Sequence, residues 1–181
     1  MVIWIIGLAG AGKTTIGREL FALLRKSEPN TVFVDGDEIR SIFKHDHDKN
    51  AYTLKGRRKN AERIGEICAW LDRQGINVIC SILSVFEETR TWNRKTYSSY
   101  FEVFIDVSMD ILKKRDKKGL YSGATAGKIE NVVGFDIPFE RPEQPDIVVN
   151  NDSEINNFQS IASNILEAYA HREKAAKNKI K

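Results

Sequence analysis

The sequence is poor in the features that mark several protein classes. Its two cysteines, Cys68 and Cys80, are too few for a disulfide framework, and their apolar neighbours predict buried thiols in a reducing compartment. No apolar run approaches the roughly 20 residues of a membrane span. The apolar start, residues 2–6, lacks the preceding basic segment of a signal peptide. We therefore expect a cytoplasmic protein without a membrane partner.

A large excess of one charge is also missing from the body of the chain. The net charge is +3, and residues 171–181 alone carry five Lys or Arg and one Glu, which leaves −1 for the remainder. A nucleic-acid-binding domain normally shows a basic face in its body, so no nucleic-acid partner is expected. Residues 171–181 are predicted to form a solvated, frayed basic tail. The other 170 residues are predicted to form one globular domain.

Short apolar runs alternate with longer amphipathic stretches. Strands are predicted at residues 2–6, 31–34, 77–80, 101–106 and 146–149, and helices at 14–26, 37–43, 54–73, 109–115 and 154–170. The Gly-rich, irregular segment 116–139 is predicted to be a lid. The alternation predicts a three-layer α/β fold with a five-stranded parallel sheet. Ligands of such sheets bind at the carboxyl ends of the strands.

A phosphate-binding loop follows the first predicted strand. Its residues are Gly7, Leu8, Ala9, Gly10, Ala11, Gly12, Lys13 and Thr14, which fit the pattern G-x-x-x-x-G-K-[ST] in full. The glycines let backbone N–H groups turn inward toward phosphate oxygens, and the following helix adds its positive N-terminus. Lys13 would neutralise β- and γ-phosphate charge, and the Thr14 hydroxyl would ligate Mg²⁺. The loop therefore predicts binding of ATP or GTP.

A second polar group follows the second predicted strand. Asp35 and Asp37 stand there, with Arg40 one helical turn further on. Two carboxylates at this edge can hold Mg²⁺ and orient an attacking hydroxyl. A helix cap at Asp37 is the structural alternative, although it explains neither both carboxylates nor Arg40.

Two classes of nucleotide-binding protein fit these motifs, a kinase of small molecules and a regulatory GTPase. The guanine-reading pattern N-K-x-D is missing, because Asn178 and Lys179 are followed only by Ile180 and Lys181. The short chain with a late Gly-rich segment suits nucleotide kinases, which close a lid over ATP to exclude water. We therefore favour the kinase.

The motifs together resemble those of one family, adenylylsulfate (APS) kinase. The resemblance covers residues 1 to about 150 and rests on GLAGAGKTT (7–15), VDGDEIR (34–40), RRKN (57–60), RIGE (63–66), FEVFID (101–106), RDKKGLY (115–121) and VGFDIPFE (133–140). This family transfers the γ-phosphate of ATP, with Mg²⁺, to the 3′-hydroxyl of APS. The product is 3′-phosphoadenylylsulfate, the activated sulfate donor of sulfate assimilation.

The resemblance also implies roles for individual residues. Asp35 and Asp37 become the pair that holds Mg²⁺ and orients the hydroxyl, and Thr15 completes the phosphate loop. The implied substrate contacts are Arg40, Tyr52, Arg57, Asn60 and Ser84, with Tyr52 in place of a Phe that stacks on the substrate base. Arg115 and Lys118 become lid cations that contact ATP. Ser84 falls on a serine traditionally assigned as a phosphoserine site. We predict direct transfer instead, with Ser84 as a positioning residue.

The departures from the family pattern gather on the acceptor side. Three extra residues lie between Arg40 and Tyr52, Gly56 replaces an acidic residue, and Glu87 reverses a charge. Three lid cations are lost at Ser122, Gly123 and Thr125, and a second stacking Phe becomes Val132. APS is the first expectation for the acceptor. The alternative is another nucleotide, such as cytidine diphosphoramidate in surface-polysaccharide modification. A homodimer is a further possibility.

Overall fold

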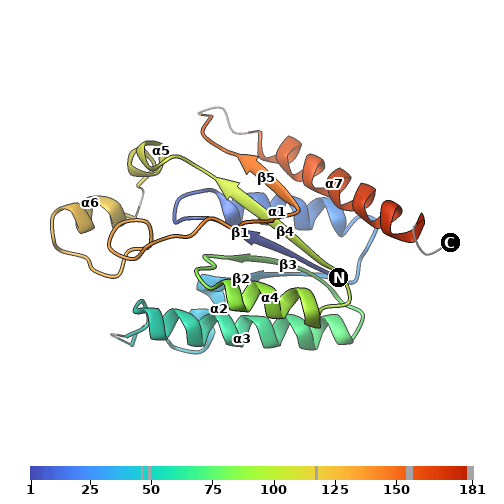
Figure 1. Cartoon of the computed structure of the whole chain (residues 1–181), viewed down its shortest axis with the longest axis horizontal. Helices are drawn as coiled ribbons and strands as arrows, with labels where there is room; N and C mark the ends of the chain where they lie inside the picture. Colours follow the sequence, from blue (N-terminus) through green and yellow to red (C-terminus); the bar gives the residue numbers. More distant parts are fainter. Residues whose placement is uncertain (46, 49, 117, 154–156, 179–181) are drawn as a thin grey trace.

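The chain folds around a five-stranded parallel sheet in the order β2-β3-β1-β4-β5. The computed structural model describes residues 1–45, 47–48, 50–116, 118–153 and 157–178. The strands are β1 (Val2–Ile6), β2 (Thr31–Asp35), β3 (Asn77–Ile82), β4 (Tyr100–Asp106) and β5 (Ile147–Asn150). The helices are α1 (Lys13–Leu24), α2 (Gly36–Ile42), α3 (Leu54–Arg73), α4 (Glu87–Thr96), α5 (Met109–Lys114), α6 (Leu120–Thr125) and α7 (Phe158–Asn178). Helices lie on both faces of the sheet, which confirms the predicted three-layer α/β fold (Figure 1).

The central strand β1 is buried throughout, because β3 and β4 flank it and helices cover both of its faces. A strand in this position needs an unbroken apolar run, which explains the sequence of residues 2–6. Ile3 and Ile5 point into the core beneath α1 and α7. Val2, Trp4 and Ile6 point into the core beneath α3 and α4. The alternation of side chains along one strand thus divides the apolar interior into two layers.

The carboxyl ends of the strands form the edge where the polar motifs meet. The phosphate loop follows β1, and Asp35 ends β2. Helix α6, within the predicted lid, lies at the end of the molecule toward which β1 and β4 point (Figure 1). The predicted lid is not wholly irregular, because α6 and a bridge between Val133 and Ile137 give it regular structure.

The end of the chain differs from the prediction. Helix α7 runs to Asn178, so the predicted helix end at residue 170 and the frayed tail are wrong for residues 171–178. Arg172 explains the difference, because its guanidinium donates to the Tyr100 carbonyl and, at 3.0 Å, to Asp146. It also lies 5.0 Å from the centre of the Phe101 ring. The predicted structure of residues 154–156 and 179–181 lies outside the described residues.

Helix α4 was not predicted, although Glu87 and Glu88 in its first turn and Arg94 and Lys95 in its last are ordinary end signals of a helix. The predicted burial of Cys68 and Cys80 as free thiols is confirmed. None of the described helices combines the length and apolarity needed to cross a bilayer.

Candidate active site

The phosphate loop adopts a conformation that glycine makes possible. Gly12 has a φ of 96°, in the left-handed region that favours glycine, and helix α1 begins at the next residue. A Cβ at Gly7 would lie 2.7 Å from the Ile105 carbonyl oxygen, so the loop also passes too close to β4 for a side chain there. The loop therefore leads into the N-terminus of α1, where backbone N–H groups and the helix dipole favour an anion.

Three side chains from distant parts of the chain hold carbonyl groups of this loop. The Tyr121 hydroxyl donates to Ala9 at 3.0 Å, the Asn151 amide to Ala11 at 2.9 Å, and the Ser81 hydroxyl to Lys13 at 3.1 Å. Asn151 and Ser81 are buried, each 2% exposed. Sequence reasoning assigned these three residues no role, because no local pattern indicates which loop carbonyl a distant side chain will reach.

Asp35 and Thr14 lie together at the start of α1, as predicted for a magnesium site. The Thr14 hydroxyl donates to Asp35 Oδ2 at 2.7 Å, while Asp35 Oδ1 caps α2 by accepting from the Asp37 amide at 2.9 Å. The predicted alternative of a cap at Asp37 is wrong, because Asp35 fills that position. A hydroxyl and a carboxylate oxygen are hard donors that suit Mg²⁺, which commonly takes one or two carboxylates plus phosphate oxygens. The residues present therefore fit the ion.

Asp37 lies between two cations. Its carboxylate accepts from Arg40 at 2.8 Å and from Lys118 at 3.3 Å. Burial by itself would raise the pKa of Asp37, but the charges of Lys118 and Arg40 outweigh it, and the net shift lowers the pKa. Asp37 is therefore a carboxylate at neutral pH, able to accept a hydrogen bond from a substrate hydroxyl.

Three of the predicted acceptor contacts form one stack. The guanidinium of Arg40 lies 4.8 Å from the centre of the Tyr52 ring, and that of Arg57 lies 5.6 Å from it. Arg57 also donates to the carbonyls of Tyr52 and Asn131, each at 2.8 Å, and so ties the start of α3 to the segment after the lid helix. The structure thus gathers one ring and two cations beside Asp37.

Two buried polar atoms among the predicted acceptor contacts lack partners. Arg40 Nε and Asn60 Oδ1 are inaccessible to water and form no hydrogen bond with the described residues. Asn60 itself is held by its amide, which donates to the Gly36 carbonyl at 3.3 Å. Unpartnered buried polar groups cost free energy unless a ligand or water completes them. Within the described part of the chain, Arg40 Nε is an unpaired donor and Asn60 Oδ1 an unpaired acceptor, and a ligand could reach either atom only if the neighbouring side chains moved.

The other predicted contacts lie apart from this stack. Ser84 is 1% exposed, at the turn between β3 and α4. Arg115 donates to the Ser153 carbonyl at 2.8 Å, beyond β5, whereas Lys118 reaches Asp37. The two predicted lid cations therefore point to different parts of the site. Val132 is 1% exposed within the core beneath α1 and α7, so it forms no open wall for a base.

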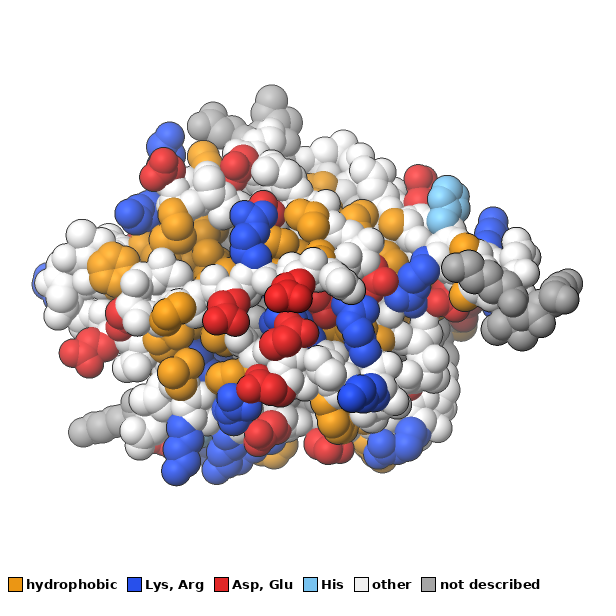
Figure 2. Space-filling model, viewed as in Figure 1, with side chains coloured by type: hydrophobic (Ala, Val, Ile, Leu, Met, Phe, Trp, Pro, Cys, Tyr) orange, Lys and Arg blue, Asp and Glu red, His pale blue; other side chains and the backbone are white. Residues whose placement is uncertain are grey.

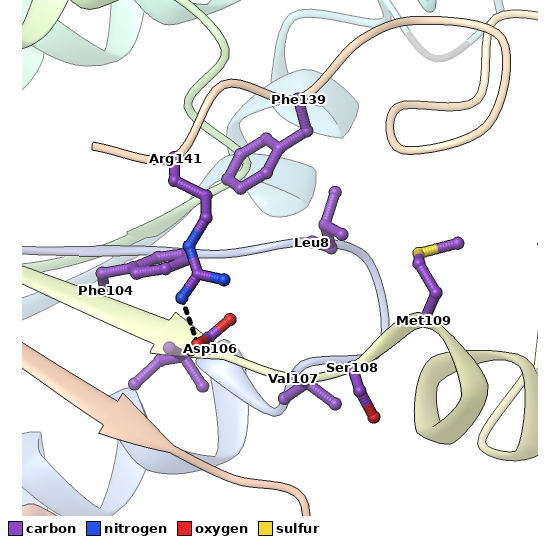
Figure 3. Close-up of a pocket in the computed structure, with 9 residues that line it drawn as sticks. Leu8, Phe104, Asp106, Val107, Ser108, Met109, Phe139 and Arg141 are labelled. Carbon is purple, nitrogen blue, oxygen red and sulfur yellow. Dashed lines mark hydrogen bonds and ion pairs between the residues drawn. The ribbon is translucent and has the colours of Figure 1, made fainter. Parts of the chain in front are cut away.

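A cavity of about 230 Å³ lies beside the phosphate loop at the carboxyl end of β4. Leu8, Phe104 and Phe139 contribute apolar wall, and Arg141 pairs with Asp106 across one side (Figure 3). Its lining includes Leu8 of the phosphate loop and none of the predicted acceptor contacts. On the face shown in Figure 2, basic side chains of the described residues are interspersed with acidic ones.

Nucleotide binding is expected to weaken above pH 8. Burial lowers the pKa of Lys13 to about 8, while Asp37 and Asp35 act against the shift and Lys118 adds to it. The ammonium form is complete below that pKa and is lost above it, so the Kd for ATP should rise by up to about tenfold per pH unit beyond pH 8. Calorimetric titrations from pH 6.5 to 9.5 measure this. In Lys118→Gln the inflection should move to higher pH. A flat profile would contradict the assignment of Lys13 to the phosphates.

Comparisons with known proteins agree on one family. The family model described as adenylylsulphate kinase matches residues 1–150. A cytidine diphosphoramidate kinase from Campylobacter jejuni is 40% identical over 169 residues, which are 93% of this chain and 96% of that protein. An adenylyl-sulfate kinase from Myxococcus xanthus is 34% identical over 155 residues, 83% of this chain and 82% of that protein. The APS kinase of Mycobacterium tuberculosis, solved with AMPPNP and APS, has a TM-score of 0.79 and 28% identity, covering 93% of this chain and 96% of its own.

Proposed function

Since the chain belongs to the adenylylsulfate kinase family, we propose that it transfers the γ-phosphate of ATP to the ribose 3′-hydroxyl of a cytidine nucleotide such as cytidine diphosphoramidate. One observation carries the choice of acceptor. The relative named for cytidine diphosphoramidate is 40% identical over nearly the full length of both chains, against 31–36% for several adenylyl-sulfate kinases. The motifs led us to expect APS first and a nucleotide such as cytidine diphosphoramidate as the alternative. We now propose the alternative.

The acceptor side of the structure supports this choice. The position at which the family pattern has a second stacking Phe is Val132, which is buried in the core and leaves the Tyr52 ring as the aromatic contact. Losing one base–aromatic contact weakens binding by roughly 1–3 kcal/mol. Cytosine is smaller than the adenine of APS and has less surface to stack. Its binding therefore depends less on a second aromatic ring. The lid also differs from the family pattern at Ser122, Gly123 and Thr125, where cations are missing, so the acceptor side has changed in its charges as well as in its aromatic contacts.

The reaction follows from the placement of the charged groups. Thr14 and Asp35 would hold Mg²⁺, which supplies charge neutralisation between the β- and γ-phosphates. Lys13 stabilises the transferring group, and the backbone of the phosphate loop binds its oxygens. Asp37 accepts a hydrogen bond from the acceptor hydroxyl and aims it at the phosphorus. Phosphoryl transfer passes through a loose transition state, so a carboxylate with a low pKa is sufficient for this task.

Burial of Ser84 supports direct transfer between the two nucleotides. At 1% exposure, its hydroxyl cannot meet the γ-phosphate without opening the turn after β3. A phosphoserine there would also place about two negative charges at a buried position in the chain next to Val85 and Phe86, which pack in the core beneath α3 and α4. Ser84 is therefore proposed as a positioning residue. We also propose that the protein acts in the cytoplasm. That it forms a homodimer remains a prediction.

Acceptor selection tests the proposal directly. We expect kcat/KM for cytidine diphosphoramidate to exceed that for APS by a hundredfold or more, which is about 2.7 kcal/mol of discrimination. Radiolabelled ATP would follow transfer to each acceptor and to cytidine diphosphate under the same conditions. Lys13→Ala, assayed in parallel, controls for contaminating kinases. Equal or better use of APS would reject the cytidine acceptor and leave the kinase assignment in place.

A further inference from the structure

The beginning of the lid is a compact, hydrogen-bonded turn. Asp116 accepts from the Leu120 amide at 2.7 Å, the Ser122 amide at 2.8 Å and the Ser122 hydroxyl at 2.9 Å. These bonds satisfy the free amides at the start of α6, a helix of six residues. These bonds hold residues 116 and 118–122 in one compact arrangement, which we call the lid turn.

Tyr121 fastens the lid turn to the phosphate loop. Its side chain is 2% exposed in the core beneath α1 and α7, and its hydroxyl donates to the Ala9 carbonyl at 3.0 Å. Burial raises the pKa of Tyr121 to about 12, so the hydroxyl keeps its proton throughout the neutral range. The bond joins positions 112 residues apart in the chain.

Lys118, three residues before Tyr121, reaches the carboxylate of Asp37 from the same turn. Its Nζ lies 3.3 Å from Asp37 Oδ2, but its side chain is 82% exposed. An ion pair exposed to this degree contributes little, so it cannot hold the lid in place by itself. The contact of Tyr121 is the stronger candidate for that task, because its ring is buried in the core and its hydrogen bond is partly buried, whereas the Lys118 side chain is exposed.

We propose that Tyr121 is a positioning residue, and that its hydrogen bond to the phosphate loop places Lys118 at Asp37, where the γ-phosphate is transferred. Without that bond the lid turn can shift, and the ammonium of Lys118 then leaves the reacting groups. The inference rests on the proposed role of Asp37. It assigns Tyr121 no contact with either nucleotide.

A double-mutant cycle separates this role from simple support of the fold. Tyr121→Phe keeps the ring and removes the hydroxyl. We expect kcat to fall about tenfold, the upper range for one buried hydrogen bond, with the KM for ATP changed less than about twofold. Lys118→Gln should lower kcat by more, roughly a hundredfold, because it removes a charge from the transition state. If Tyr121 acts through Lys118, the double variant should be no slower than Lys118→Gln alone.

Ser81→Ala provides the matched control, because Ser81 holds the Lys13 carbonyl of the same loop from β3 rather than from the lid. In the double variant of Ser81→Ala and Lys118→Gln, the fold-losses in kcat of the two single variants should multiply. If the kcat losses of Tyr121→Phe and Lys118→Gln also multiply in their double variant, the proposal is overturned. Tyr121 would then only support the loop. Wild-type kcat in Lys118→Gln would also overturn it. All assays use ATP with the faster of the two acceptors, below the melting temperature of each variant, so the cycle is independent of which acceptor is physiological.

Discussion

Replacing Lys13 by alanine is expected to lower kcat by roughly 10²–10³-fold or more, the loss found when one preorganised electrostatic group is removed from a transition state. The Lys13 ammonium donates to the Leu8 carbonyl at 2.8 Å. The negative charges of Asp37 and Asp35 interact with it electrostatically. It is thus the cation nearest to where the β- and γ-phosphates would lie. Steady-state kinetics with saturating ATP and acceptor measure the loss.

Stability should change little in this variant, because Lys13 is the first residue of α1 and alanine is well tolerated in a helix. Lys26→Ala, an exposed lysine just beyond the other end of the same helix, serves as the matched control and should retain full activity. Near-normal turnover in Lys13→Ala would mean that the phosphate loop is not the catalytic site.

Asp37→Asn is expected to lower kcat by roughly a hundredfold or more, while ATP binding changes much less. The substitution keeps the shape of the side chain but removes the charge that binds Arg40 and Lys118 and that would orient the acceptor hydroxyl. Measurement of kcat by initial rates, and of the Kd for ATP by calorimetry, separates the two effects.

Glu38→Gln is the control for this variant, since Glu38 is the next residue and its carboxylate pairs with Arg18 at the surface. An exposed pair of this kind contributes little, so activity should be unchanged. An effect of Asp37→Asn confined to ATP affinity would remove Asp37 from the acceptor side of the reaction.

The local elements at the centre of the site could be predicted because each has a local physical cause. The unbroken apolar run of β1, the glycines after it and Lys13 at the start of α1 are adjacent in the sequence, so one continuous pattern describes them. Asp35 could be placed at the same edge because parallel strands direct their carboxyl ends to one side. The contact of Thr14 with Asp35 at 2.7 Å agrees with that placement.

Elements whose stability comes from distant contacts could be predicted less well. Residues 171–178 have the composition of a solvated tail, yet Arg172 binds Tyr100 and Asp146 and extends α7 across them. Helix α6 contains two residues of low helix propensity in Ser122 and Gly123. It forms because Asp116 satisfies its first amides and Tyr121 packs into the core.

By itself, the sequence determined the three-layer fold, the phosphate-loop pattern and the family, since all of these depend on short patterns and strand order, and it predicted the magnesium pair. Only the tertiary structure decided that Val132 lies in the core, that Arg115 and Lys118 point to different partners, and that Tyr121 fastens the lid to Ala9. The physical reason is that these features depend on where side chains from separate elements meet. That geometry is set by the packing of the whole domain, and no pattern within one segment encodes it.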